Sequence, residues 1–179
     1  MGNLTTEEKL VQAVDGNQYE TVRDILETVD DVNALRYRKG GRYRPLQRAA
    51  YGDSVEIAEL LLDAGADIEV QGYYRRTPLL TALSHGKLRI AALLLERGAS
   101  MTVEDDEGDG VFELSCHSMD TFNLVLKYAH KDHLKAWLDA NFSYCAGFVP
   151  LDVLHLMLNL GCLLYTSPSP RDRGCSRMP

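Results

Sequence analysis

Apolar positions between residues 44 and 100 follow two closely similar patterns that lie 33 residues apart. In both patterns, small and apolar residues first recur at spacings of three and four, which places them on one face of a helix. Each pattern then continues into a second apolar run that contains three consecutive leucines and ends in Gly-Ala. A fixed period of this size indicates a stack of helical pairs, because one pair is too small to bury its own apolar face.

Particular residues in the second copy predict where its helices begin and end. Thr77 is suited to cap a helix with its hydroxyl, and Pro78 is suited to the first helical position, where its missing N–H costs nothing. Gly86 is expected to end that helix. The run from about Leu88 to Glu96 is apolar over much of its circumference, which predicts a helix covered on both sides. Gly98 is expected to supply a left-handed cap at its end.

Weaker copies flank the two clear ones. At the N-terminal side, Thr5 and Glu8 have the spacing of a capping box, and the charged residues around them indicate a polar terminal cap. Downstream the pattern decays, although helices are still predicted near Val111–His117 and Asp120–Ala129. The predicted units are residues 5–35, 44–68 and 77–101, with degenerate units at 110–130 and 132–161.

The two clear copies resemble ankyrin repeats. The residues that carry this resemblance are Thr77-Pro78-Leu79, Ala82, Gly86, Leu93-Leu94-Leu95 and Gly98-Ala99, and in the neighbouring copy Pro45-Leu46, Ala49-Ala50, Leu60-Leu61-Leu62 and Gly65-Ala66-Asp67. The chain departs from the family pattern where Leu80 and Gln47 replace the usual histidine, and where Asp53 replaces the glycine between the helices.

The resemblance implies a fold and a kind of function. The implied fold is an all-α solenoid of stacked helix-turn-helix units with projecting loops, and the implied function is protein–protein interaction without catalysis. It also implies that Tyr51, Ser84 and His85, at first-helix positions on the concave side, help to read the partner.

Two loops between the predicted units combine basic and aromatic residues. If stacking places these loops side by side, they form one ridge, and the acidic loop at 104–109 continues it with the opposite sign. We predict that the ridge docks an acidic or phosphorylated segment of a partner protein, since Arg and Tyr are frequent interface anchors. The alternative is that the acidic loop neutralises the basic loops internally. The predicted partner-binding residues of the ridge are Arg36, Tyr37, Arg38, Lys39, Arg42, Tyr43, Arg44, Tyr73, Tyr74, Arg75 and Arg76.

Composition and motifs narrow the function further. The 179 residues carry a formal net charge of −7, which argues against general affinity for nucleic acid. The sequence contains no glycine-rich phosphate loop, nucleophile elbow or His-Glu-x-x-His motif, so we expect no catalysis, no cofactor and no metal. His130 and His133 lie three residues apart, but no further metal ligand accompanies them.

The location of the protein is predicted from what the sequence lacks and from its first residues. No apolar run is long enough to cross a bilayer, and the N-terminus has no secretory apolar core, which predicts a cytoplasmic protein or, alternatively, a nuclear one. The start, MGNLTT, fits the pattern for myristoylation of Gly2. Association with a membrane is expected only if that lipid is attached.

The last 18 residues differ from the rest of the chain. Residues 162–179 are rich in Ser, Pro and Arg and resemble a translated sequencing adapter, so we expect a non-native tail, or alternatively a disordered one, after a repeat domain at 1–161. We expect the natural chain to continue beyond Gly161. Three hypotheses follow: a non-catalytic adaptor or scaffold, a substrate-recognition or regulatory segment of a longer enzyme, ubiquitin-ligase receptor or channel, and a lipid-tethered scaffold.

Overall fold

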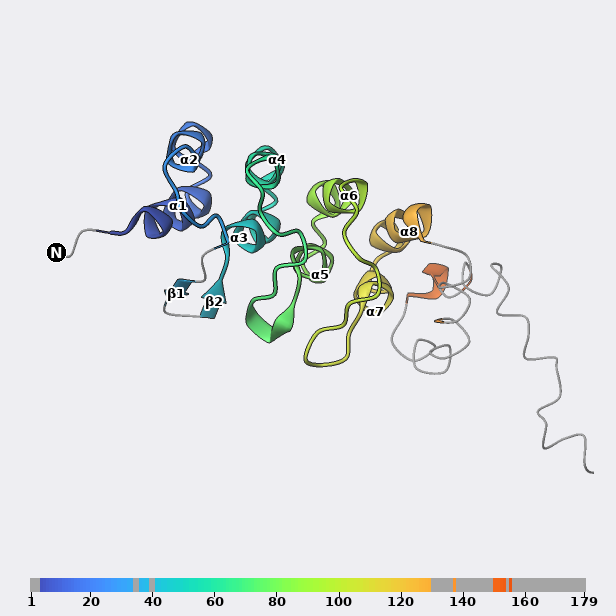
Figure 1. Ribbon diagram of the computed structural model, residues 1–179. Helices are drawn as coiled ribbons and strands as arrows, with labels where there is room; N and C mark the ends of the chain where they lie inside the picture. Colours follow the sequence, from blue (N-terminus) through green and yellow to red (C-terminus); the bar gives the residue numbers. More distant parts are fainter. Residues whose placement is uncertain are drawn as a thin grey trace, which may run out of the picture.

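The computed structural model describes residues 4–33, 36–38, 41–129, 137, 150–153 and 155. Helical pairs follow one another along the chain and form two rows (Figure 1). The first helices of the pairs are α1 (Thr6–Asp15), α3 (Pro45–Gly52), α5 (Pro78–Ser84) and α7 (Val111–Ser115). The second helices are α2 (Tyr19–Leu26), α4 (Val55–Asp63), α6 (Leu88–Glu96) and α8 (Met119–Tyr128). Each helix contacts the same helix of the neighbouring pair, which confirms the predicted solenoid.

The predicted helix starts are present. Thr77 caps α5 by accepting a hydrogen bond from the backbone N–H of Leu80 at 3.3 Å, and Pro78 occupies the first helical position. At α1, Thr5 and Glu8 form the predicted capping box: each side chain accepts a hydrogen bond from the backbone N–H of the other residue. These caps satisfy N–H groups that have no partner within the helix.

One backbone position between the two helices of a pair is left-handed in three successive units. It is occupied by Asn17 with φ 52°, Asp53 with φ 58° and Gly86 with φ 64°. Glycine adopts this conformation without strain, and Asn and Asp tolerate it better than other residues. The departure from the family pattern at Asp53 therefore preserves the turn. After the second helices, Gly65 and Gly98 are also left-handed, with φ 87° and 86°.

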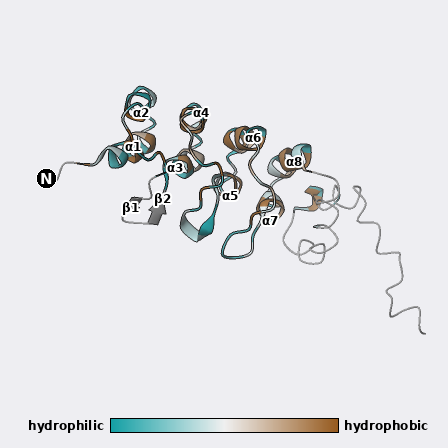
Figure 2. Cartoon of the chain, viewed as in Figure 1, coloured by the Kyte–Doolittle hydropathy of each residue, from teal (hydrophilic) through white to brown (hydrophobic). Residues whose placement is uncertain are grey.

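The core lies where the two rows meet. The hydropathy colouring shows apolar residues gathered on the facing sides of the helices (Figure 2). Large side chains with less than 2% of their surface exposed come from both rows and from every pair: Leu10, Leu46, Leu79, Leu80 and Val111 in the first helices, and Val22, Ile57, Leu61, Ile90, Leu94 and Phe122 in the second. Burial of this apolar surface is the main stabilising contribution, and each pair depends on its neighbours for it.

Polar contacts on the surface repeat with the same period. Arg89 approaches Glu56 at 3.3 Å, Arg97 approaches Asp63 at 2.8 Å, and the backbone N–H of Asp67 donates to the side chain of Asn33 at 2.8 Å. The two residues of each contact are 33 or 34 positions apart in the sequence, because stacking places each residue beside its counterpart in the next unit. Exposed ion pairs of this kind contribute little stability, about 0–1 kcal/mol each, but they fit only one register of the stack.

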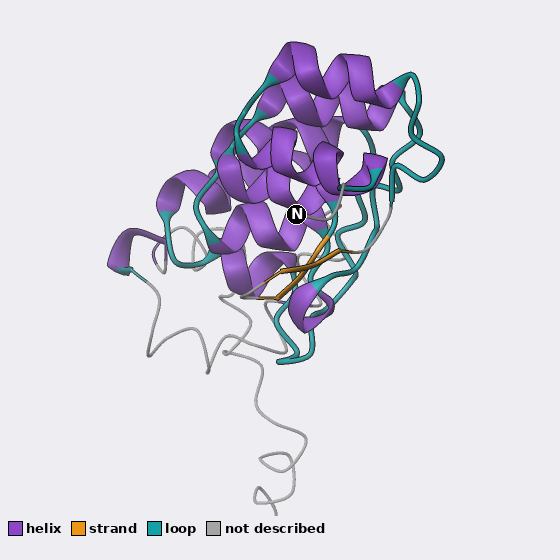
Figure 3. Cartoon of the chain, turned by 90° about the vertical axis from the view of Figure 1, so that its left-hand side faces the viewer, coloured by secondary structure: helices purple, strands orange, loops and turns teal. Residues whose placement is uncertain are grey.

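Loops project from the row of first helices, as predicted. The first loop contains a short antiparallel hairpin of β1 (Arg36–Arg38) and β2 (Gly41–Tyr43), in which Tyr37 is opposite Arg42. The second contains the 3-10 turn η1 (Tyr73–Arg75), and β2 contacts it (Figure 3). Two of the predicted loops are therefore neighbours in space.

The structure describes only part of the region for which the C-terminal repeat units are predicted. The helices predicted near Val111–His117 and Asp120–Ala129 are present as α7 and α8, with slightly different ends. The predicted unit at 132–161 lies mostly outside the described residues, and the tail at 162–179 lies entirely outside them. Within the described part of the chain, no helix is both long and apolar enough to cross a membrane.

Candidate partner-binding site

A pocket of about 240 Å³ opens between α3, α5 and the loop that carries η1. Two first helices supply one side of it, and the loop supplies the other. The pocket is lined by Gln47, Tyr51, Tyr73, Tyr74, Arg76, Thr81 and His85. A concave surface with aromatic walls and a few polar groups is the usual form of a binding site.

Aromatic rings form much of the pocket wall. Tyr51 and His85 meet edge to face, with ring centroids 4.7 Å apart, and so do Tyr73 and Tyr74, with centroids 4.1 Å apart. The side chains of the three tyrosines remain about half exposed although their rings touch a neighbour. The side-chain hydrogen bond with Tyr73 favours the protonated hydroxyl of Tyr74 and raises the pKa of Tyr74 above its ordinary value. Rings that are held in place while still exposed can bind a partner at little cost in conformational entropy.

The loop tip that carries two of these rings has an unusual backbone. Tyr74 and Arg75 are consecutive left-handed residues, with φ 54° and 53°, and neither is glycine. Each such residue costs about 1–2 kcal/mol, so the surrounding structure has to hold the tip in place. The following loop does so, because the backbone N–H of Asp106 donates to the carbonyl of Tyr74 at 3.0 Å.

An ion pair joins the same two loops. The Nε of Arg76 donates to Oδ2 of Asp105 at 2.8 Å, and Nη2 of Arg76 donates to Glu107 at 3.3 Å. The side chain of Asp105 is fully buried. Burial acts to raise the pKa of Asp105, but the hydrogen bonds from Arg76 and from the backbone of Asp109 and Glu107 outweigh it, so the pKa is lowered. Asp105 therefore stays ionised and fastens the loop of η1 to the next one.

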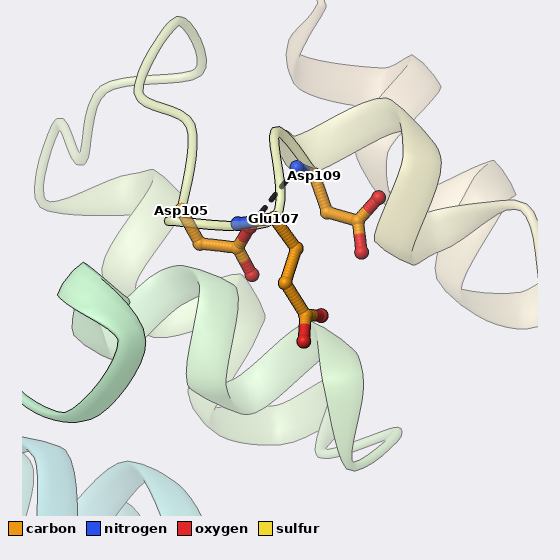
Figure 4. A group of neighbouring side chains, drawn as sticks. All are labelled: Asp105, Glu107 and Asp109. Atoms are coloured by element: carbon orange, nitrogen blue, oxygen red, sulfur yellow. Dashed lines mark hydrogen bonds between the residues drawn. The ribbon is translucent and has the colours of Figure 1, made fainter.

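The acidic residues at the centre of this contact form a compact group (Figure 4). Oxygens of Asp105, Glu107 and Asp109 lie within 4.8 Å of one another. However, Oδ1 of Asp105 accepts hydrogen bonds from the backbone N–H groups of Glu107 and Asp109 at 2.8 and 3.0 Å, and Oδ2 is bound to Arg76. The hydrogen bonds of the central carboxylate thus give the group a structural role in the loop.

Gln47 connects α3 to the loop that carries η1. Its Nε2 donates to the carbonyl of Arg76, whereas Oε1 is buried and accepts no hydrogen bond from the described residues. The amide packs directly against Gly72, where an added Cβ would lie only 1.9 Å from Oε1. A side chain at residue 72 would therefore force the Gln47 amide to move.

The polar groups on the α5 side of the pocket already use their hydrogen-bond donors. The hydroxyl of Thr81 donates to the carbonyl of Thr77 at 2.9 Å. Nδ1 of His85 lies 2.9 Å from the carbonyl of Thr81, and because a carbonyl only accepts, this contact places the proton on Nδ1. In the neutral ring, Nε2 of His85 is then a hydrogen-bond acceptor.

Several predicted site residues come together in this structure. Tyr51, His85, Tyr73, Tyr74 and Arg76 all line the pocket, although they belong to three separate segments of the chain. Ser84 is beside them, with its hydroxyl 3.0 Å from Nδ1 of His85. Gln47 and Thr81 also line the pocket, although the sequence did not predict them as site residues. In the sequence, Gln47 is marked only by its departure from the ankyrin pattern, which has a histidine at this position.

The other predicted site residues either hold neighbouring loops together or lie outside the residues that the structure describes. Arg44 donates from Nε to the carbonyl of Gln71 at 3.2 Å and from Nη1 to the carbonyl of Asn33, so it ties adjacent loops together. Arg76 is paired with Asp105 and Glu107 of the acidic loop at 104–109, as expected if that loop neutralises the basic loops internally. The following predicted positions lie outside the described residues or have side chains outside them: Gly2, Arg36, Tyr37, Arg38, Lys39, Arg42 and Tyr43.

Comparison with known proteins agrees with this architecture. A family model of three ankyrin repeats matches residues 10–105, and the chain belongs to the ankyrin repeat family. Ankyrin repeats are protein-interaction modules, so the chain is a protein-interaction module.

The chain is similar to parts of much longer proteins. It is 48% identical over 62 residues to the Arabidopsis thaliana ADP-ribosylation factor GTPase-activating protein AGD4, a match that covers 35% of this chain and 8% of that protein. It is 36% identical over 70 residues to the A. thaliana E3 ubiquitin-protein ligase KEG, covering 39% of this chain and 4% of the ligase. It is 26% identical over 176 residues to a Caenorhabditis elegans homologue of transient receptor potential cation channel subfamily A member 1, covering 86% and 14%. The chain thus spans a small part of the length of these relatives.

Proposed function

We propose that this chain is a non-catalytic adaptor or scaffold that binds a partner protein through its loop tips and through the pocket between α3 and α5. The observation that carries the proposal is the position of Tyr73 and Tyr74. A strained loop tip holds these rings beside Tyr51 and His85 on the adjoining helices. One backbone hydrogen bond, to Tyr74, and two side-chain contacts of Arg76 join this tip to the next loop. A loop with no partner to bind would have little need for such a costly backbone.

We propose further that the partner presents an acidic or phosphorylated segment to the basic end of the ridge. The hairpin is basic by sequence, with Arg36, Arg38 and Arg42, and β2 contacts the turn that carries Arg75. The side chain of Arg75 is 64% exposed, its Nε donates to Oε1 of Gln71 at a long 3.4 Å, and it approaches Asp106 at 3.9 Å. A guanidinium held this loosely is available for a carboxylate or phosphate of a partner.

A second candidate function is recognition within a longer protein. The relatives include a GTPase-activating protein, a ubiquitin ligase and a channel homologue, and in each the similarity covers at most 14% of the length. In this proposal the repeats select a substrate or regulate a neighbouring domain, while that domain performs the activity. The full-length coding sequence distinguishes this function from that of a free-standing adaptor.

Location and lipid attachment complete the proposal. We propose that the protein acts in the cytoplasm, or in the nucleus, and that it reaches a membrane only if Gly2 is myristoylated. Mass spectrometry of the mature N-terminus tests the lipid directly.

The test of the proposed partner contact is charge reversal in an affinity capture experiment. Arg42→Glu and Arg75→Glu should each reduce recovery of the partners captured by the unchanged chain, because each replaces an attractive charge with a repulsive one. Arg89→Glu is the matched control, since Arg89 is equally exposed but belongs to α6 in the other helix row. Recovery unaffected by the two ridge variants would contradict the acidic or phosphorylated segment.

A further inference from the structure

We propose that the pocket between α3, α5 and the η1 loop binds an arginine side chain of the partner, with the guanidinium between the tyrosine rings. This inference rests on the proposed function and adds a specific chemistry to its concave face. It also assigns opposite charges to two parts of the partner: an acidic part at the hairpin and a basic residue at the pocket.

Acceptors outnumber free donors among the polar groups of the pocket wall at α3 and α5. Gln47 donates to the carbonyl of Arg76, Thr81 to that of Thr77, and His85 to that of Thr81. These internal bonds leave two positions without an internal donor contact, namely the hydroxyl oxygen of Thr81 and Nε2 of His85, which accepts whenever Nδ1 alone carries the ring proton. A ligand rich in N–H donors complements this set, whereas a carboxylate or phosphate does not.

The charges around the pocket also favour a cation. Arg76 is the basic residue in the pocket lining, and it already faces two carboxylates, those of Asp105 and Glu107. The one guanidinium of the lining is thus outnumbered by the two carboxylates that it faces. The whole chain carries a net charge of −7, so the general field also favours a cation.

The shape of the pocket suits a flat cationic group. The walls present the rings of Tyr51, Tyr73 and Tyr74, and the electron-rich face of an aromatic ring attracts a cation. Arginine fits these walls better than lysine, because its planar guanidinium stacks on rings and spreads five N–H donors over separate acceptors. The structure already shows such a contact, since the guanidinium of Arg76 lies 5.8 Å from the centre of the Tyr74 ring. The pocket of about 240 Å³ is large enough for a guanidinium and its aliphatic stem.

The experiment uses the full chain and five capped peptides, Gly-Gly-X-Gly-Gly, in which X is arginine, lysine, citrulline, norleucine or glutamate. Binding is followed by two-dimensional NMR of the backbone amides and of the Gln47 side-chain amide. The arginine peptide should bind with a dissociation constant of about 1 mM, as expected for one side chain, and should shift signals of Gln47, Tyr74, Thr81 and His85. The lysine peptide should bind more weakly. Citrulline keeps most of the shape but lacks the charge and should bind about fivefold more weakly or worse.

Variants separate the pocket from the rest of the surface. Tyr51→Ala and Tyr74→Ala remove exposed rings, so the fold should remain intact by circular dichroism, and each should weaken the arginine peptide about fivefold. Tyr19→Ala is the matched control, because Tyr19 is similarly exposed but belongs to α2, and this variant should bind normally. Equal binding of norleucine and arginine, tighter binding of glutamate, or no localised shift with any peptide would each overturn the inference.

These outcomes are distinguishable from failure of the proposed function. The peptide titration changes one residue of a probe and needs no natural partner, whereas the capture experiment changes Arg42 and Arg75 and measures natural partners. If capture depends on those two arginines while no peptide binds the pocket, the inference alone fails. If the arginine peptide binds while charge reversal leaves capture unchanged, the acidic-segment proposal alone fails.

Discussion

Arg76 and Asp105 form a partly buried ion pair between two loops of successive repeats, with Nε and Oδ2 2.8 Å apart. We expect Asp105→Asn to lower the free energy of unfolding by about 1–3 kcal/mol, because the amide keeps an oxygen for the loop N–H groups but loses the ionic bond to Arg76. The expected loss is moderate because Arg76 retains Glu107. Urea denaturation followed by circular dichroism measures it, and Asp120→Asn at the exposed start of α8 is the control.

The same carboxylate predicts a dependence of stability on pH. The pKa of Asp105 in the folded protein is below its ordinary value of 3.8, so its contribution is complete above that value and is lost as the pH falls through the folded pKa. The difference in unfolding free energy between the unchanged chain and Asp105→Asn should therefore stay constant from neutral pH down to the ordinary value and shrink below it. A difference that grew on acidification would contradict the pairing.

Gly72 and Gln47 should be energetically coupled. Gly72→Ala places a Cβ against the Gln47 amide and should destabilise the protein by about 1–3 kcal/mol through displaced packing. In a Gln47→Ala background the space is vacant, and Gly72→Ala should cost much less. A double-mutant cycle measures this coupling, and strictly additive effects would show that the two residues do not compete for the same space.

The left-handed turn predicts opposite effects at two equivalent positions. Asp53→Gly should stabilise the protein by up to about 1 kcal/mol, since it relieves backbone strain and removes a buried carboxylate oxygen that has no hydrogen bond from the described residues. Gly86→Ala introduces strain at the matching turn and should destabilise by about 1 kcal/mol. Thermal unfolding of the two variants provides the comparison, and equal signs would contradict the equivalence of the turns.

The stacked core predicts that single leucines carry much of the stability. Leu94 is fully buried in α6, and Leu94→Ala should cost about 2–5 kcal/mol in unfolding free energy. Leu4→Ala is the control, because Leu4 is half exposed and its truncation should change stability by less than about 0.5 kcal/mol. Equilibrium denaturation of both variants checks the difference.

The sequence by itself determined the helices, their caps and their stacking. Thr77, Pro78 and Gly86 act through neighbours one to four residues away, and the 33-residue period requires each helical pair to bury its apolar face against the next. For the same reason the loops that would project from the stack could be identified, together with the aromatic residues that they carry.

Only the tertiary structure decided what those loop residues do. The contacts of Arg76 with Asp105, of Gln47 with Arg76 and of Tyr51 with His85 each join positions 29 to 34 residues apart. The sequence predicted a basic ridge available to a partner. In the structure, however, Arg76 forms an ion pair with a carboxylate in the next loop, and Arg44 donates hydrogen bonds to two backbone carbonyls. Which charges are paired and which remain available depends on distances of a few ångströms across the stack. Those distances are set by how neighbouring repeats pack, which local sequence patterns do not encode.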